Sequence, residues 1–427
     1  MKSIAVLTAV GCVLAGLSSF SSGWTTSPPP ATQPGLSDAP PTIDPKPLSK
    51  QVDQGLAWLI ARQRTDGGWN QEEESPHMVQ ARNAEPAAAG EPSNVADSCM
   101  ALLALMRAGH TPTSGAPAEA VARGVAFVCG KVESADADSL WVTDVRNTRT
   151  QSKLGTYVDT YLAALVLGEV KPMLAEGELK TRVSAALDKT VGKMQRNDAQ
   201  LQGENGWAVA LSRGIRGKAM NKAAAEGARV DLALLAQANA AARDTVLPSG
   251  GGTGGRADFA PATDAAGIGL YGAASSIQQL QEAVNADRRM EADLRSQLDA
   301  PTTSPSDRQA IKRKLSEVKD NAQQLATARA AIVDKLGDDQ FVAGFGSNGG
   351  EEFLSYWAIG ETLVTERDAA FAAWDRKMTE NLNRVQNDDG SWSGHHCITG
   401  KTFCTASALL VLTVDRTNVP VAAGVRR

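Results

Sequence analysis

The stretch W-L-I-A-R-Q-R-T-D-G-G-W, from Trp58 to Trp69, decides the fold because it returns near the other end of the chain. Its second copy is L-N-R-V-Q-N-D-D-G-S-W, from Leu382 to Trp392. Both copies keep a Gln four residues before a Gly and six residues before a Trp, and each precedes a segment rich in Ala and Leu. Such repetition is typical of repeat proteins, whose units stack to bury their faces.

The body of the chain is predicted to be helical. Ala, Leu, Gln, Arg and Glu dominate one segment after another, and the alternating β-branched runs typical of strands are scarce. Residues 52–63 form an amphipathic pattern, whereas residues 96–108 leave almost no polar face. A helix that is apolar all round is buried, so we expect the amphipathic helices outside and the apolar helices inside.

Two-part units of this kind recur along residues 48–414. The third copy is the loosest: residues 183–195 supply its amphipathic helix, and Val230 and Asp231 lead into its apolar helix at Leu232. The other copies show the same alternation of amphipathic and apolar segments and cover residues 123–167, 352–362 and 371–414.

Two segments interrupt the repeat: the Gly-rich residues 249–255, which predict a flexible loop, and the longer segment 275–336. Residues 275–336 carry apolar side chains at helical spacing on both sides of a turn that contains Pro301 and Pro305. Two long charged helices joined by a short turn predict an inserted antiparallel helical hairpin. Arms of about 25 residues could project about 40 Å and serve as a docking arm. The alternative is a hairpin that folds down and only covers apolar surface.

The N-terminus has the pattern of an export signal. A lysine precedes the apolar run of residues 4–17, and small residues follow, so residues 1–23 are predicted to be a signal peptide. The run falls short of the ~20 apolar residues of a membrane span. We therefore expect an exported protein, periplasmic, secreted or at the cell surface, with no membrane span in the mature chain. Residues 24–47 are Pro-rich and predict an extended linker, and residues 415–427 form a tail.

The charge of the chain excludes one class of partner. The formal net charge is −5, and no large basic cluster is present, so nucleic acid is not expected as a ligand. A protein, a peptide or an apolar ligand is left as the candidate partner.

The pattern W-L-x-x-x-Q-x-x-x-G-x-W at residues 58–69 resembles the QW repeat of squalene and oxidosqualene cyclases. Residues 123–128 resemble the first half of the same repeat. The chain is thus similar to the α/α-toroid superfamily, which also contains the β-subunits of protein prenyltransferases. The resemblance implies an all-α fold, an α/α toroid of repeated helix pairs. The repeated Gln and Trp are interpreted as structural, because the amide can bond backbone groups of a neighbouring helix end and the indole can pack across the junction.

The chemistry of the cyclases is not expected here. Those enzymes use an acid motif of the type D-x-D-D, which D-A-D-S at residues 136–139 and N-D-D-G at residues 387–390 do not match. Aromatic residues make up only 5% of the chain, which is little for a cavity that stabilises cations. The sequence therefore predicts a non-catalytic binding or scaffold module without a cofactor.

A zinc-dependent enzyme is the alternative. The prenyltransferase resemblance implies a metal held by D-x-C at the start of an inner helix and a distant His, and residues 97–99 have that spacing. In a closed ring the first and last repeats would be neighbours, and Cys and His ligands suit zinc. The candidate ligands are the Asp, Cys and His side chains near this junction: Asp97, Cys99, His395, His396, Cys397 and Cys404.

Two structural interpretations of these residues are alternatives to a metal site. Cys397 and Cys404 could form a disulfide, because an exported chain meets oxidising conditions. Asp97 could cap or charge a helix N-terminus, since Asp159 stands at the matching place in the next unit without a following Cys.

Overall fold

The computed structural model describes residues 45–75, 91–115, 117–197, 201, 204, 206–244, 246–248, 257–259, 268–346, 348–366 and 368–417. The predicted signal peptide, most of the linker and most of the tail lie outside these residues. The regular elements of the described residues are helices apart from one short pair of strands, which confirms the all-α expectation.

The described elements follow one another as α1 (Lys50–Ala61), α3 (Val95–Arg107), α4 (Ala118–Ser134), α5 (Arg149–Leu154), α6 (Val158–Val170), η1 (Lys171–Met173), α7 (Glu178–Arg196), α9 (Val209–Ala225), α10 (Leu232–Asp244), β1 (Val246–Pro248), β2 (Ala257–Phe259), α11 (Gly269–Asp299), α12 (Pro305–Lys335), α13 (Asp339–Ala343), α14 (Gly350–Leu363), α15 (Ala369–Arg384), α16 (Lys401–Leu412) and η2 (Val414–Arg416). The two strands pair antiparallel, with Val246 opposite Phe259.

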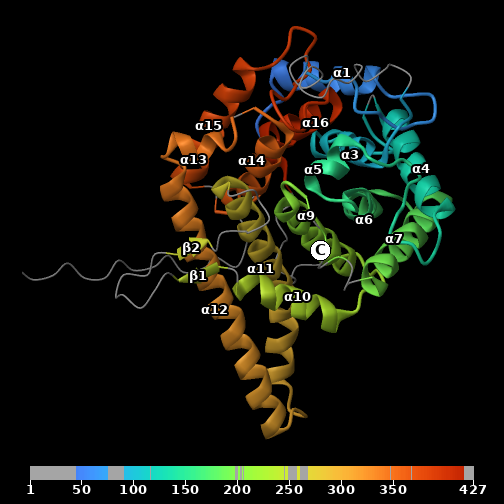
Figure 1. The fold of residues 1–427 in the computed structure, drawn as a ribbon. Helices are drawn as coiled ribbons and strands as arrows, with labels where there is room; N and C mark the ends of the chain where they lie inside the picture. The colour runs from blue at the N-terminus through green and yellow to red at the C-terminus, as the bar shows by residue number, and fades with distance from the viewer. Residues whose placement is uncertain are drawn as a thin grey trace, which may run out of the picture. The chain divides into compact units, whose positions relative to one another are not determined.

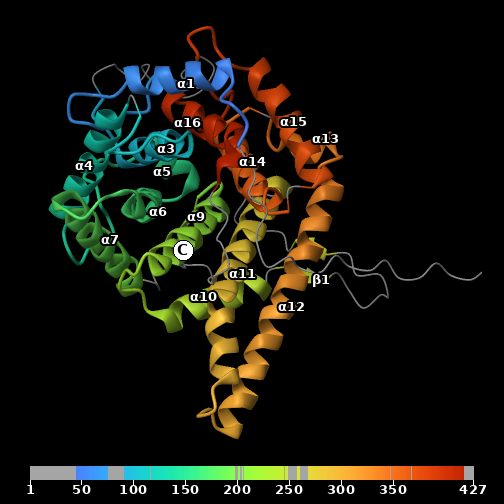
Figure 2. The same cartoon turned by 180° about the vertical axis from the view of Figure 1, so that it is seen from behind.

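The inner helices, as we call α3, α6, α9, α11, α14 and α16, contact one another in a closed cycle. Each packs on the next in this order, and α16 packs back on α3 (Figures 1 and 2). Helix α6 is apolar all round and buries every residue except Glu169, as expected of a helix with neighbours on all sides. The other long helices pack outside this cycle, and α1 contacts α16, so the first and last repeats are neighbours.

The turn after α1 links that helix to α4 through the side chain of Gln63. Gln63 Nε2 donates to the carbonyl oxygen of Gly67 at 2.8 Å and to that of Ala120 in α4 at 2.7 Å. The fully buried Trp69 donates from Nε1 to the carbonyl oxygen of Leu59 at 2.7 Å. The structural roles predicted for this Gln and Trp are confirmed.

The turn after α15 repeats this geometry and links the end of the chain to its beginning. Gln386 Nε2 donates at 2.9 Å to the carbonyl oxygens of Gly390 and of Gln51 in α1. Trp392 Nε1 donates to the carbonyl oxygen of Leu382 at 2.8 Å. Gly390 has φ of +87°, a left-handed conformation that glycine adopts without steric cost. The two copies of the motif are therefore the same joint, used between successive outer helices.

The third repeat differs from its prediction. The inner helix of this unit is α9, not the helix that starts at Leu232, which is α10 and lies outside α9 and α11. Leu232 is 69% exposed. Helix α9 does not have the apolar pattern expected of an inner helix, because it carries Lys218 and Lys222 on a face that lines a charged cavity.

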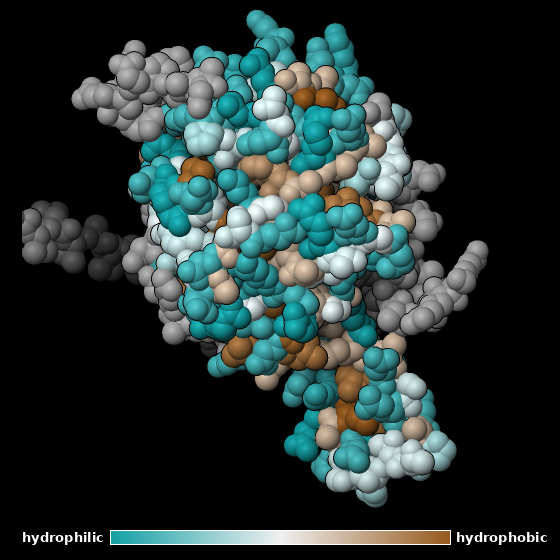
Figure 3. All heavy atoms as spheres, turned by 90° about the vertical axis from the view of Figure 1, so that its right-hand side faces the viewer, coloured by the Kyte–Doolittle hydropathy of each residue, from teal (hydrophilic) through white to brown (hydrophobic). Residues whose placement is uncertain are grey.

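The helical hairpin is formed by α11 and α12, but it is not wholly an insertion. Helix α11 is an inner helix over its first half, where its residues are buried up to Asp287. Asn321 Nδ2 of α12 donates to Asp287 Oδ2 at 2.6 Å, at the level where the buried part ends. Beyond it the hairpin extends away from the inner helices (Figures 1, 2 and 3), and Met290 is 48% exposed.

Across the part of the chain that the structure describes, helices of the length and hydropathy needed to span a bilayer are not found.

Candidate functional site

The inner helices all point the same way, so they have a common N-terminal end and a common C-terminal end. At the N-terminal end, the backbone N of Ala96 in α3 donates to Asp159 Oδ1 of α6 at 3.0 Å. At the same end, the backbone N of Gly350 in α14 donates to the carbonyl oxygen of Ile398 before α16, at 2.9 Å. The candidate zinc ligands lie at this N-terminal end.

Asp97 and Cys99 lie inside the packed start of α3. The Asn94 side chain caps this helix by accepting from the backbone N of Asp97 at 2.9 Å, and its Nδ2 donates to Asp97 Oδ2 at 2.6 Å. Burial raises the pKa of Asp97 to about 7, and it raises the pKa of the fully buried Cys99 thiol as well. Asp159 caps α3 across the helix interface, so an acidic residue at the start of an inner helix has a structural role, as the capping interpretation expects.

Of the other four candidate ligands, one is exposed and three are buried near the start of α14. His395 is exposed, whereas His396 is buried with Nε2 3.5 Å from Glu352 Oε2. Cys404 Sγ donates to the carbonyl oxygen of Ile398 at 3.3 Å.

Neither sequence interpretation of the cysteines is realised in the structure. Cys397 and Cys404 are free buried thiols, so the alternative disulfide is not formed. Among the described residues, no three His, Cys, Asp or Glu side chains stand close enough together to hold a metal ion. The six predicted zinc ligands therefore share one end of the inner helices without forming a ligand set.

Sequence analysis missed a buried acidic pair at this end. Glu351 and Glu352 open α14 and are fully buried. The Tyr271 hydroxyl donates to Glu352, and the backbone N of Phe345 donates to Glu352 Oε1 at 2.9 Å. Burial, assisted by the neighbouring Glu352, raises the pKa of Glu351 to about 8. The sequence signal that could have revealed this pair is an acidic residue in the first turn of an apolar helix, the same place that Asp97 occupies in α3.

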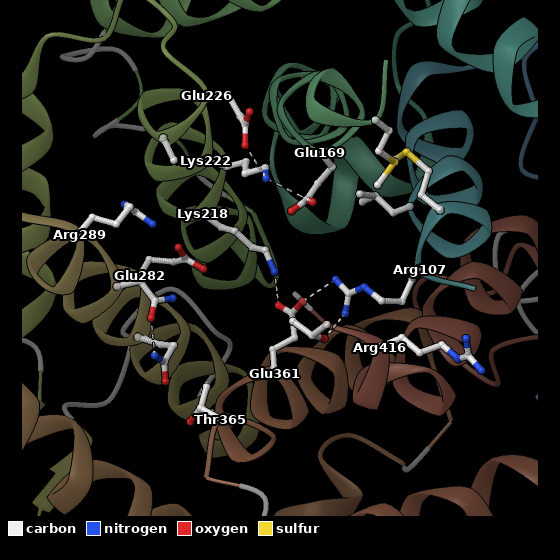
Figure 4. Close-up of a pocket in the computed structure, with 17 residues that line it drawn as sticks. Arg107, Glu169, Lys218, Lys222, Glu226, Glu282, Arg289, Glu361, Thr365 and Arg416 are labelled. Atoms are coloured by element: carbon white, nitrogen blue, oxygen red, sulfur yellow. Dashed lines mark hydrogen bonds and ion pairs between the residues drawn. The ribbon is translucent and has the colours of Figure 1, made fainter. Parts of the chain in front are cut away.

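The C-terminal end of the inner helices holds a cavity of about 280 Å³, which we call the central cavity (Figure 4). Five of the six inner helices and η2, which follows the sixth, supply charged side chains to its lining. These charged residues are Arg107 of α3, Glu169 of α6, Lys218, Lys222 and Glu226 around the end of α9, Glu282 and Arg289 of α11, Glu361 of α14, and Arg416 of η2.

Most charges around the central cavity are paired with one another. Glu361 lies between Arg107, whose Nη2 is 2.8 Å from Oε1, and Lys218. Burial opposes the ionisation of Glu361, but these two cations outweigh it and lower the pKa of the carboxyl below its usual range. Lys222 Nζ lies 2.9 Å from Glu226 and 3.8 Å from Glu169.

Glu282 and Arg289 differ from these pairs. Both project from α11 toward the central cavity (Figure 4), and within the described residues neither has an ion-pair partner. Burial raises the pKa of Glu282 to about 7, although Lys218 and Arg289 oppose this. Next to them, Oε1 of the buried Gln281 has no hydrogen-bond partner.

A second cavity, of about 420 Å³, lies outside the inner cycle, among α7, α9, α10 and α11. Apolar and amide side chains make up most of its lining, and Ala238 of α10 is part of it. It provides a control position for experiments on the central cavity.

The central cavity could not be predicted from the sequence because its charges come from segments far apart in the chain. Lys218 and Glu361 are separated by 143 residues, and no local motif contains both. Sequence comparison gives no guide either: compared with known protein families, with curated proteins and with solved structures, the chain has no match.

Proposed function

We propose that the chain is an exported, non-catalytic repeat protein of the α/α-toroid kind that binds a small polar ligand in its central cavity. The apolar run of residues 4–17 supports export. The closed cycle of inner helices and the two equivalent Gln–Trp joints support the toroid arrangement.

One observation carries the binding proposal: five of the six inner helices, and η2 after the sixth, bring charged side chains to a single cavity. Charged side chains at a cavity wall lose hydration when an apolar molecule covers them, which costs free energy. A ligand with its own charged and hydrogen-bonding groups replaces that hydration. A peptide therefore suits the central cavity better than the apolar ligand that the sequence left open.

The exposed end of the hairpin is a second proposed contact, as a docking arm for a partner protein. Its support is that both views of the chain show the distal parts of α11 and α12 away from the inner helices (Figures 1 and 2). The binding proposal does not depend on it.

A matched pair of cavity-filling variants tests the proposal. Ala225 of α9 and Ala238 of α10 are both exposed alanines, and each lines one of the two cavities. Ligand-observed NMR would be run on a panel of short peptides, amino acids and charged or apolar small molecules.

Compounds that bind the wild type should lose binding to Ala225→Trp and keep it for Ala238→Trp. The proposal is wrong if the panel yields no binder, or if Ala238→Trp alone abolishes binding.

A further inference from the structure

The charges of the central cavity fall into two classes. Glu361 is held by Arg107 and Lys218, and Lys222 is held by Glu226 and Glu169, so these groups already neutralise each other. One carboxylate and one guanidinium on α11 stay without an ion-pair partner in the described part of the chain. A ligand that gains most from this cavity carries a cation for the first and an anion for the second.

The helix positions of these two groups indicate the length range of a ligand that reaches both. Glu282 and Arg289 are seven residues apart on one helix, which is two turns. At a rise of 1.5 Å per residue, their positions are separated by about 10 Å along the helix. An extended peptide advances about 3.3–3.6 Å per residue, so three residues cover the same distance.

We propose that the ligand of the central cavity is a linear zwitterion whose ammonium group binds Glu282 and whose carboxylate binds Arg289. The inference rests on the proposed binding in this cavity and specifies its ligand class. Two sources share this chemistry: a tripeptide with free ends and an unbranched ω-amino acid of the same length.

Gln281 favours the peptide. Its Nε2 donates to Asn285 Oδ1 at 2.9 Å, which orients the amide and leaves Oε1 buried without a donor. A buried acceptor left unpaired costs about 1–3 kcal/mol. Gln281 lines the cavity, and a rotation of its amide would present this acceptor to a peptide N–H, which the methylene chain of an ω-amino acid does not have.

The size and apolar walls of the cavity agree with a small peptide. A volume of about 280 Å³ lies near the lower end of ligand pockets, which span roughly 300–1,000 Å³. Leu103, Met106 and Met173 complete the lining, and they can pack against small apolar side chains. Trialanine is therefore the probe of choice.

Calorimetric titration with capped probes separates the two ends of the ligand. The wild type should bind trialanine about tenfold more tightly than N-acetyl-trialanine and than trialanine amide, a difference of about 1.4 kcal/mol for each end. The ω-amino acid 8-aminooctanoate, which has both charges and no amide, should bind more weakly than trialanine.

Two variants assign each end to its residue. Glu282→Gln should bind trialanine and N-acetyl-trialanine equally, while still discriminating against the amide. Arg289→Gln should show the reverse, and Arg289→Lys should restore the preference for a free carboxylate. Thermal melts confirm that each variant is folded. The titrations are repeated on a variant lacking residues 418–427, which follow Thr417 of the cavity wall in the sequence.

The outcomes distinguish this inference from the function on which it rests. If Glu282→Gln and Arg289→Gln keep both preferences of the wild type, the assignment of the two ends is wrong. If trialanine does not bind but another compound binds in a way that Ala225→Trp abolishes, the ligand class is wrong and the cavity still binds. If no compound is sensitive to Ala225→Trp, both proposals fail.

Discussion

The two ends of the inner helices use the same residue types for different purposes. At the N-terminal end, Asp159 accepts from Ala96 of the neighbouring helix and Glu352 accepts from Tyr271, so each buried acid has a partner within the fold. At the C-terminal end, Glu282 faces a cavity without one. A raised pKa occurs at both ends, so a perturbed carboxyl group alone does not identify a binding site. What identifies the binding site is that Glu282 lies at a cavity and has no ion-pair partner among the described residues.

Among the changes that test this difference between the two ends, substitutions at the N-terminal end should have the largest effect, a loss of stability. Trp69 and Trp392 are fully buried and join successive repeats. Replacing either by Ala should cost about 3–5 kcal/mol of the free energy of unfolding, because a large cavity is left behind. Urea denaturation measures this.

The exposed Ala225→Trp at the other end is the control, with a change below about 0.5 kcal/mol. Equal decreases in the free energy of unfolding for Trp392→Ala and Ala225→Trp would contradict this difference between the two ends.

The second-largest effect is expected in the pH dependence of stability, which should differ between acidic residues at the two ends. The pKa of Glu351 is about 8 in the folded protein against 4.5 for a free Glu, because of burial and the nearby Glu352. The unfolded chain therefore releases this proton first as the pH rises. The stabilising contribution of the protonated group is complete below about pH 4.5 and is lost as the pH rises toward 8.

Glu351→Gln has no proton to release, so its free energy of unfolding should fall less than that of the wild type between about pH 5 and 8. One pKa unit corresponds to about 1.4 kcal/mol, and the difference should be on the order of 2–4 kcal/mol. Glu361 at the other end has the opposite sign, since its lowered pKa adds stability that is lost at acidic pH. Parallel pH profiles for the wild type and Glu351→Gln would show that Glu351 is not held protonated.

Ligand affinity should depend on pH at the C-terminal end. Glu282, which faces Lys218, Arg289, Glu361 and Glu169, has a pKa of about 7, raised by burial. Its carboxylate form binds an ammonium group, so trialanine affinity should increase several-fold as the pH rises through about 7. It should decrease above about 8, where the peptide amine loses its proton. Calorimetry from about pH 6 to 9 tests this, and a Glu282→Gln variant that retains the increase would contradict it.

The smallest effect is expected for the distal hairpin. Replacing residues 292–316 by a Gly-Ser turn keeps the buried parts of α11 and α12, including the Asp287–Asn321 hydrogen bond. Stability and trialanine affinity should change little, as thermal melts and calorimetry can show. A large loss of affinity would mean that the exposed hairpin contributes to the central cavity.

The sequence predicted the fold where its signals are local. The spacing of Gln63 and Trp69 identified a joint between helices because the turn and its hydrogen bonds lie within one repeat. The inner helix of the third unit was placed at Leu232 and not at α9, because Lys218 and Lys222 interrupt the apolar pattern of α9, and these same residues line the cavity.

The sequence pointed to a site at the N-terminal end, whereas the site that we propose lies at the C-terminal end. His395, His396 and Cys397 are adjacent in sequence, which made them visible as a group, but only His396 and Cys397 are buried, and the described residues hold no set of metal ligands there. The central cavity is lined by residues of five inner helices and of η2, which come together only in the closed cycle of inner helices.

The most direct test of the central claim is a structure of the protein determined with an excess of trialanine. We predict one peptide in the central cavity, with its ammonium group beside Glu282 and its carboxylate beside Arg289. A peptide bound at the N-terminal end of the inner helices, or in the cavity beside Ala238, would contradict the account.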